Sequence, residues 1–227
     1  MGAEMAQNNI LNLKENIMRE YHKIETLFER DEKTKKLIIG KFRNATVEFL
    51  KDNVWTFTEK VDGTNIRVFW NGHNVEFGGR TDNAQIPAHL INRLNELFGG
   101  ETNAQMFEQK FGETPVELFG EGYGVKIQKG GAYRDDVDFI LFDVLIGDNY
   151  QPRESVEDIA KYFGIDVVPI VLEGTLQDGL DYVLNNRNSI IAKNGAELEG
   201  LVGRTKIETK DRTGKRNIVK IKYRDFN

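Results

Sequence analysis

The sequence predicts an α+β fold made mainly of antiparallel sheets with flanking helices. Two observations lead to this prediction: short runs rich in β-branched or aromatic residues recur along the chain with helical segments between them, and neighbouring runs are joined by tight turns. The chain has 227 residues, 39% of them hydrophobic and 10% aromatic, which is enough to form a substantial core. It contains no internal repeat or low-complexity linker, so we expect one continuous domain.

The elements of the first half follow from periodicity and turn chemistry. A surface helix is expected over residues 8–22, because Ile10, Leu13, Ile17 and Tyr21 have the spacing of one helix face. Strands are expected at 36–42, 54–60, 65–70 and 73–78, and helices at 87–98 and 102–111. Asn71-Gly72 predicts a hairpin turn between the last two of these strands.

The second half continues the mixed pattern. Strands are expected at 115–120, 138–146, 166–172, 198–207 and 217–223. Helices are expected at 155–163 and 175–186, with Ser155 and Thr175 as N-caps. A polar turn at 211–214 joins the last two strands.

Composition and charge restrict the function. With no cysteine, the chain has no disulfide, no thiolate nucleophile and no cysteine-based zinc site. No run is long enough to span a membrane and the amino terminus lacks the layout of a secretion signal, so we expect a cytoplasmic protein without a membrane partner. The net charge of -5 argues mildly against nucleic acid, yet residues 204–224 hold nine cations and two acids. This basic segment suits phosphate contacts, although a solvated charged hairpin is an alternative interpretation.

Lys60 is a candidate nucleophile. It ends one predicted strand and begins the turn Lys60-Val-Asp-Gly63, which is followed by another strand. Burial beside other cations favours the neutral form of a lysine amine, and that form attacks electrophilic phosphorus or carbon. By itself, the same pattern is also common in ordinary hairpin turns.

Three carboxylates and a pair of lysines occupy unusual positions. Glu121 follows a strand among glycines, while Asp143 and Glu199 lie in apolar strand patterns, where a carboxylate needs a partner or a metal. The alternation of strand 217–223 places Lys220 and Lys222 on one face and apolar residues on the other.

Other phosphate-binding signatures are missing. The Gly-Lys pairs at 40 and 214 are followed by Phe or Arg instead of Ser or Thr, so neither is a P-loop. The glycines at 120, 122 and 124 do not complete a dinucleotide fingerprint. The three scattered histidines, His22, His73 and His89, are expected to be surface or core residues.

The order of six motifs resembles the covalent nucleotidyltransferase superfamily, and within it the RNA ligase 2 family. They are Glu59-Lys-Val-Asp-Gly-Thr-Asn65, Phe77-Gly-Gly-Arg-Thr81, Phe119-Gly-Glu-Gly-Tyr123, Leu141-Phe-Asp143, Glu199-Gly-Leu-Val202 and Lys220-Ile-Lys222. The resemblance covers residues 54 to 224. It implies an ATP-grasp-like adenylation domain of the nucleotidyltransferase type, and an ATP-dependent enzyme that joins the 3'-hydroxyl and 5'-phosphate ends of RNA.

The resemblance also implies roles for individual residues. Lys60 would become bonded to AMP, and Lys220 and Lys222 would grip the α-phosphate and the leaving group. Glu59 and Asn65 would contact the nucleoside or organise water bound to a metal ion, and Arg80 would touch the ribose or a nucleic-acid phosphate. Glu121 would bind the ribose and Phe142 would stack on adenine. Asp143, Glu199 or both would help to hold Mg²⁺, directly or through water, and Mn²⁺ could substitute for it.

The expected domain organisation leaves the substrate open. We expect residues 1–50 to form an amino-terminal extension and 51–227 to form the adenylation domain, without the separate carboxyl-terminal domain of larger relatives. The partner could therefore be RNA ends or a nicked duplex of RNA or of RNA and DNA. A GTP-dependent capping guanylyltransferase, a DNA-nick ligase and an inactive nucleic-acid-binding homologue remain as alternatives.

Overall fold

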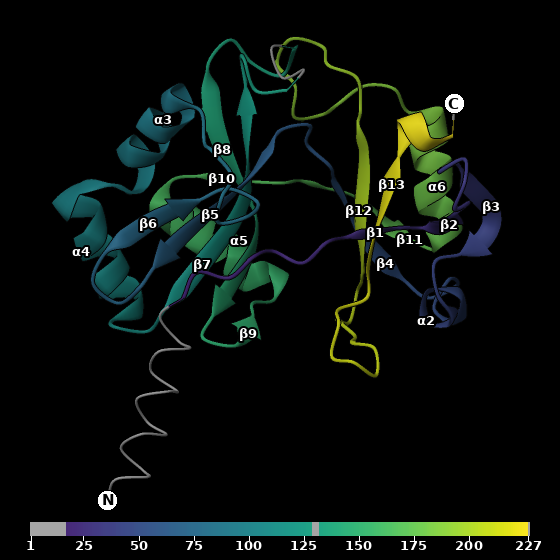
Figure 1. Cartoon of the computed structure of the whole chain (residues 1–227), viewed down its shortest axis with the longest axis horizontal. Coiled ribbons are helices and arrows are strands. Elements are labelled where there is room, and N and C mark those ends of the chain that lie inside the picture. Colours follow the sequence, from purple (N-terminus) through teal and green to yellow (C-terminus); the bar gives the residue numbers. More distant parts are fainter. Residues whose placement is uncertain (1–16, 129–131, 227) are drawn as a thin grey trace, which may run out of the picture. The chain divides into compact units, whose positions relative to one another are not determined.

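The computed structural model describes residues 17–128 and 132–226. The chain forms two compact units, each assembled from separate segments. Of the described residues, the first unit comprises 17–21, 63–128 and 135–167, and the second comprises 22–62, 132–134 and 168–226. Figure 1 traces their elements along the sequence.

The first unit contains a mainly antiparallel sheet in the order β10-β8-β7-β5-β6, with β9 paired to β8. The strands are β5 (Thr64–Trp70), β6 (Val75–Gly78), β7 (Val116–Gly124), β8 (Val137–Ile146), β9 (Asn149–Tyr150) and β10 (Asp166–Val167). The helices are α3 (Ala88–Phe98), α4 (Gly100–Phe111) and α5 (Arg153–Phe163). Alternate residues of β5, including Ile66 and Val68, are buried in one cluster with Leu90 and Leu94 of α3.

The second unit contains a sheet in the order β1-β13-β12-β4-β11 and a separate hairpin of β2 and β3. The strands are β1 (Glu25–Thr26), β2 (Phe28–Arg30), β3 (Leu37–Phe42), β4 (Trp55–Glu59), β11 (Ile170–Gly174), β12 (Gly200–Thr205) and β13 (Ile218–Lys222). Helices α2 (Ala45–Phe49) and α6 (Leu176–Asn185) and the 3-10 turn η2 (Tyr223–Asp225) complete it. Trp55 and Phe57 of β4 pack in the same core as Leu176 and Leu180 of α6. The predicted α+β class is confirmed, and its pairings are antiparallel except for β1 with β13 and β10 with β8.

Local chemistry accounts for several predicted boundaries. Helix α6 begins where expected, because the Thr175 side chain accepts from the backbone of Asp178 while the Asp178 carboxylate accepts from the backbone of Thr175. Between β5 and β6, the Asn71 side chain accepts from the N–H groups of His73 and Asn74, so the predicted hairpin turns over four residues instead of two. The polar turn at 211–214 is also present, with a bond from Gly214 N–H to the Asp211 carbonyl.

Other predicted boundaries are wrong. The strand expected at 166–172 is two strands, β10 and β11, in different units; Pro169 lies between them and has no N–H to donate to a ladder. Helix α5 begins at Arg153 after Pro152, so Ser155 is not its N-cap. The strand expected at 198–207 begins only at Gly200, and Glu199 precedes it.

The helix expected at 8–22 lies partly outside the described residues, since its first nine positions belong to the segment 1–16. Residues 17–22 are not helical. Instead, the Arg19 N–H donates to both carboxylate oxygens of Glu117 at 3.0 Å, and the Tyr21 ring packs against Phe119. Tertiary contacts with the sheet therefore override the helical spacing of this segment.

The division expected at residue 50 stays a prediction, although β1, β2 and β3 belong to the same unit as β4. Within the ranges that the structure describes, none of the helices has the length and apolar character needed to cross a lipid bilayer.

Candidate functional site

Lys60 lies directly after β4 in the second unit, and the backbone around it is fixed on both sides. The Lys60 N–H donates to the Gly200 carbonyl at 2.9 Å, and the Glu59 N–H donates to the Pro169 carbonyl at 3.1 Å. Gly200 has a φ of 154°, and a Cβ there would lie 2.0 Å from the Ile221 carbonyl oxygen. Only glycine fits at this position, which explains why Gly200 follows Glu199 in the sequence.

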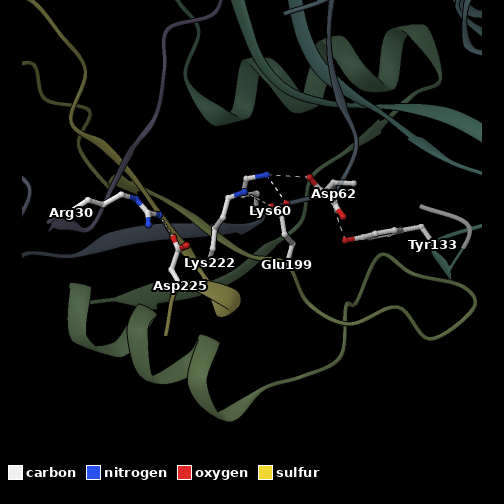
Figure 2. A network of polar contacts seen from close by, with 8 residues as sticks. Arg30, Lys60, Asp62, Tyr133, Glu199, Lys222 and Asp225 are labelled. Carbon is white, nitrogen blue, oxygen red and sulfur yellow. Dashed lines mark hydrogen bonds and ion pairs between the residues drawn. The ribbon is translucent and has the colours of Figure 1, made fainter. Parts of the chain in front are cut away.

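One carboxylate joins two lysine amines in the second unit, as Figure 2 shows. Glu199 Oε2 is 2.5 Å from Lys60 Nζ, and Glu199 Oε1 is 2.5 Å from Lys222 Nζ. The side chains are 10% exposed for Glu199, 23% for Lys60 and 13% for Lys222, so the group is mostly removed from water. Since an unpaired charge at such a depth is costly, each amine depends on the shared carboxylate.

Lys220 lies on the same face of β13 as Lys222, as the strand alternation predicts. Burial, together with the nearby charges of Lys222, Lys60 and Lys23, lowers the pKa of Lys220 to about 8. Val219 and Ile221 face the hydrophobic core on the other side of the strand. The structure therefore brings the three predicted catalytic lysines close to one end of the sheet.

Glu59 is almost completely buried, and its carboxylate binds other residues of the second unit. One of its oxygens accepts from the Ser189 hydroxyl, and the other accepts from the Ile190 N–H at 2.8 Å. Burial raises the pKa of this carboxyl, and the hydrogen bonds partly oppose that effect. Glu59 thus anchors the loop 186–199 next to Lys60, and the nucleoside contact expected for it stays a prediction.

Asn65 and Glu121 face each other across β5 and β7 in the first unit. The side-chain oxygen of Asn65 is buried and has no hydrogen-bond partner among the residues that the structure describes. Gly63, which begins the segment of this unit that follows Asp62, passes so close to β7 that a Cβ would lie 2.4 Å from the Gly122 carbonyl oxygen. The glycine of the Lys60–Gly63 turn is therefore required by close backbone packing.

Phe142 is the extra residue of a β-bulge. The pairing of β7 with β8 passes from Phe119↔Asp143 to Gly120↔Leu141, so Phe142 has no direct partner. Phe142 is partly exposed, whereas its neighbours Leu141 and Asp143 are buried. The bulge thereby turns an aromatic ring out of the buried strand, where it can contact a ligand.

Asp143 accepts a hydrogen bond from the Tyr21 hydroxyl at 2.8 Å in the first unit. The Tyr21 ring also lies edge-on to Phe142, with ring centroids 5.0 Å apart. Asp143 therefore has a clear structural partner, while the metal-binding role expected for it stays a prediction. Since Glu199 belongs to the second unit, the structure does not assign the two predicted metal ligands to one site.

Arg80 is exposed in the loop that follows β6. This loop is held by Arg67, whose fully buried guanidinium donates to the Gly79 carbonyl at 2.7 Å and to Asp82 Oδ1 at 2.9 Å. We did not predict a role for Arg67. Its signal in the sequence is an arginine inside the otherwise apolar stretch Ile66–Trp70, a pattern that requires a buried partner.

A divalent cation at this site would have few protein ligands. Among the described ranges, no group of three or more His, Asp or Glu side chains could hold a metal ion. Mg²⁺ usually keeps several waters and binds one or two carboxylates together with substrate phosphates. Glu199 is one such carboxylate, but each of its oxygens is paired with a lysine amine, so its metal-binding role stays a prediction.

The basic segment 204–224 is partly neutralised by local pairs. Lys206 pairs with Glu173 at 2.6 Å, and Arg216 pairs with Glu208. The connection between β12 and β13 thus carries cations that are paired with Glu173 and Glu208. Its role in phosphate binding stays a prediction.

Comparison with known proteins identifies the family. Residues 53–222 match the family model described as RNA ligase. The search of curated proteins gave no significant match.

Solved structures with the same fold include RNA ligases from Naegleria gruberi. A variant of that enzyme with ATP and Mn has a TM-score of 0.61 and 19% identity, over 88% of this chain and 59% of that one. A variant with AMP and Mn has a TM-score of 0.59 and 19% identity, over 93% of this chain and 62% of that one. The same ligase with pyrophosphate has a TM-score of 0.58 and 20% identity, over 90% of this chain and 60% of that one.

This chain therefore corresponds to about three fifths of the length of those ligases. The family match covers most of the chain and includes every residue that we predicted for the site. The chain belongs to the RNA ligase family.

Proposed function

We propose that this protein is an ATP-dependent RNA ligase that joins a 3'-hydroxyl to a 5'-phosphate through a lysyl-AMP intermediate on Lys60. The observation that carries the proposal is the position of the Lys60 amine, 2.5 Å from a carboxylate that also binds Lys222. A nucleophile for phosphoryl chemistry needs fixed geometry and nearby positive charge, and this arrangement supplies both. The family match and the ATP found in similar structures point to the same reaction.

In the first step, the neutral Lys60 amine attacks the α-phosphorus of ATP, a P–N bond forms, and the bond to pyrophosphate breaks. Lys60 must first lose its ammonium proton, which would pass to Glu199 Oε2, the oxygen in contact with the amine. When ATP and Mg²⁺ or Mn²⁺ are bound, the metal supplies positive charge beside the reacting phosphate. Metal-binding roles are proposed for Glu199, whose oxygens the structure pairs with Lys60 and Lys222, and separately for Asp143 of the first unit.

Lys220 and Lys222 supply the remaining positive charge. Negative charge develops on the phosphate oxygens in the transition state, so a positioned amine stabilises the transition state more than the ground state. With a pKa of about 8, Lys220 is mostly protonated near neutral pH and can bind an anion. Lys222, fixed by Glu199, is placed to act on the α-phosphate or the leaving group.

We assign recognition of the nucleoside mainly to the first unit. Phe142, turned outward by the bulge, would stack on adenine, and Glu121 would bind the ribose. Asn65 would contact the nucleoside with the side-chain oxygen that has no partner within the described ranges. Arg80 is exposed and would reach the ribose or a phosphate of the nucleic acid, and Glu59 would act by shaping the loop beside Lys60.

In the second and third steps, the adenylate passes from Lys60 to the 5'-phosphate of RNA, and the 3'-hydroxyl then attacks that activated end and releases AMP. RNA ends, free or in a nicked duplex, are therefore the proposed partners. The exposed cations of the hairpin between β12 and β13 would contact the phosphate backbone.

The test is covalent labelling with ATP carrying a label on its α-phosphate. We expect wild-type protein with Mg²⁺ to be labelled, and Lys60→Ala to remain unlabelled. Lys51→Ala is the matched control, because Lys51 lies in the same unit and pairs with the exposed Asp52, and it should be labelled normally.

Two outcomes would contradict the proposal. Label retained in Lys60→Ala would remove Lys60 from its role, and preferential labelling by GTP would indicate a capping-type guanylyltransferase. Sealing of matched RNA and DNA nicks beside single-stranded ends then separates an RNA ligase from a DNA-nick ligase.

A further inference from the structure

We propose that Tyr133 is a positioning residue for the nucleophile, and that its hydroxyl fixes the turn that carries Lys60. This inference rests on the proposed function, and it assigns a role to a residue outside the six motifs. The Tyr133 hydroxyl accepts a hydrogen bond from the Asp62 N–H at 3.3 Å. Asp62 is two residues after Lys60, inside the Lys60–Gly63 turn.

Tyr133 is itself held rigidly in the second unit. Its side chain is buried, and its backbone carbonyl accepts from the Lys193 N–H at 2.8 Å. Lys193 belongs to the loop that Glu59 anchors through Ser189 and Ile190. The Lys60–Gly63 turn is thus connected to the loop 186–199 twice. The Glu59 carboxylate binds this loop directly before the turn, and Tyr133 links Asp62 of the turn to Lys193 of the same loop. Figure 2 shows the contact between Tyr133 and Asp62.

The chemistry of the phenol suits this role. Burial and the nearby carboxylates of Glu59, Glu199 and Asp62 raise the pKa of Tyr133, so it stays a neutral phenol in the working pH range. A neutral phenol can accept from the Asp62 N–H at any pH at which the enzyme works. When that hydroxyl is missing, the N–H loses this acceptor, and the turn can relax away from the geometry that sets Lys60 against Glu199.

The position of Lys60 matters in some steps of ligation and not in others. Formation of the lysyl adduct and transfer of AMP to the RNA end both use the Lys60 amine. Sealing of an RNA end that already carries AMP does not use it as a nucleophile. A residue that positions Lys60 should therefore affect the first reactions selectively, whereas a general loss of structure would affect all of them.

The experiment compares Tyr133→Phe with Tyr162→Phe. Tyr162 is the matched control, because its hydroxyl donates to the backbone carbonyl of Met106, in the first unit. We expect Tyr133→Phe to lower the maximal rate of adduct formation on the order of 10- to 100-fold, with a change in the KM for ATP of less than about threefold. Its sealing of a pre-adenylated RNA strand should stay within about twofold of wild type, and Tyr162→Phe should match wild type in every assay.

A structural readout accompanies the kinetics. Hydrogen exchange of the peptide that contains Asp62 should be faster in Tyr133→Phe and unchanged in Tyr162→Phe, because only the first variant removes the acceptor of that N–H. Adduct formation at the wild-type rate, unchanged exchange at Asp62, or equal losses in adduct formation and in sealing would each overturn the positioning role. Wild-type protein that forms no adduct would instead overturn the proposed function itself, so the two failures are distinguishable.

Discussion

Replacing Glu199 by glutamine tests the link between the architecture of the site and its chemistry. The substitution keeps the size of the side chain and removes the charge that two lysine amines share. Each contact is 2.5 Å long, which corresponds to roughly 7 kcal/mol of attraction at an effective dielectric constant of about 20. Most of that attraction offsets the cost of taking the ions out of water, and removing one partner of a buried pair costs about 3–5 kcal/mol.

We expect Glu199→Gln to lower the free energy of unfolding by that amount and the melting temperature by roughly 6–20 °C. Differential scanning calorimetry measures the change. The control is Glu173→Gln, which removes a carboxylate 2.6 Å from Lys206 in a pair that is largely exposed. This control should lower the melting temperature far less than Glu199→Gln does, because water screens an exposed pair.

A double variant separates charge from packing. In Glu199→Gln with Lys222→Met, one of the two unpaired ammonium groups is gone, so we expect a smaller loss of stability than the sum of the two single changes. Adduct formation should be lost in both variants that lack Glu199. The reasoning would be refuted if Glu199→Gln had the same melting temperature as Glu173→Gln and formed the adduct at the wild-type rate.

Three further predictions concern pH, stability and nucleotide affinity. Burial raises the pKa of Glu117 from 4.5 to about 7, so the folded protein binds the carboxyl proton more tightly than the unfolded chain does. The free energy of unfolding should therefore fall by on the order of 3 kcal/mol as the pH rises from 4.5 to 7. Melting curves of Glu117→Gln at several pH values should lack this part of the pH dependence. Burial lowers the pKa of Lys220 to about 8, so at pH 7 the folded protein carries a charge that destabilises it relative to the unfolded chain. Lys220→Met should therefore melt at a higher temperature at pH 7 while forming the adduct more slowly. A lower melting temperature would contradict the burial of this amine. Phe142→Ala should raise the KM for ATP roughly 10- to 100-fold, because the variant loses about 1–3 kcal/mol of base stacking. An unchanged KM would exclude stacking by this ring.

The sequence predicts most of this fold because its local signals agree with its tertiary contacts. Strands β4, β5, β7, β8 and β13 are found within a few residues of the expected positions, and the Thr175 cap starts α6 as expected. The failures occur where distant residues decide the conformation. Residues 17–22 have helical spacing but are held by Glu117, Phe119 and Asp143, none of which is near in sequence.

The lysines and acids of the site could be recognised because their chemistry is visible in short motifs. The residues that hold them in place could not be recognised in this way. A tyrosine near position 130 carries no sign that its hydroxyl meets Asp62, and Ser189 carries no sign that it binds Glu59, because both contacts join segments more than 70 residues apart. Local patterns report the groups that react, whereas the groups that hold them in place are set by the folded chain.

The most direct test of the account is intact-mass spectrometry of the protein after incubation with ATP and Mg²⁺, followed by peptide mapping. The account predicts the mass of one adenylate added through an acid-labile P–N bond, on the peptide that contains Lys60. An unmodified mass in folded protein, or an adenylate found on another residue, would contradict it.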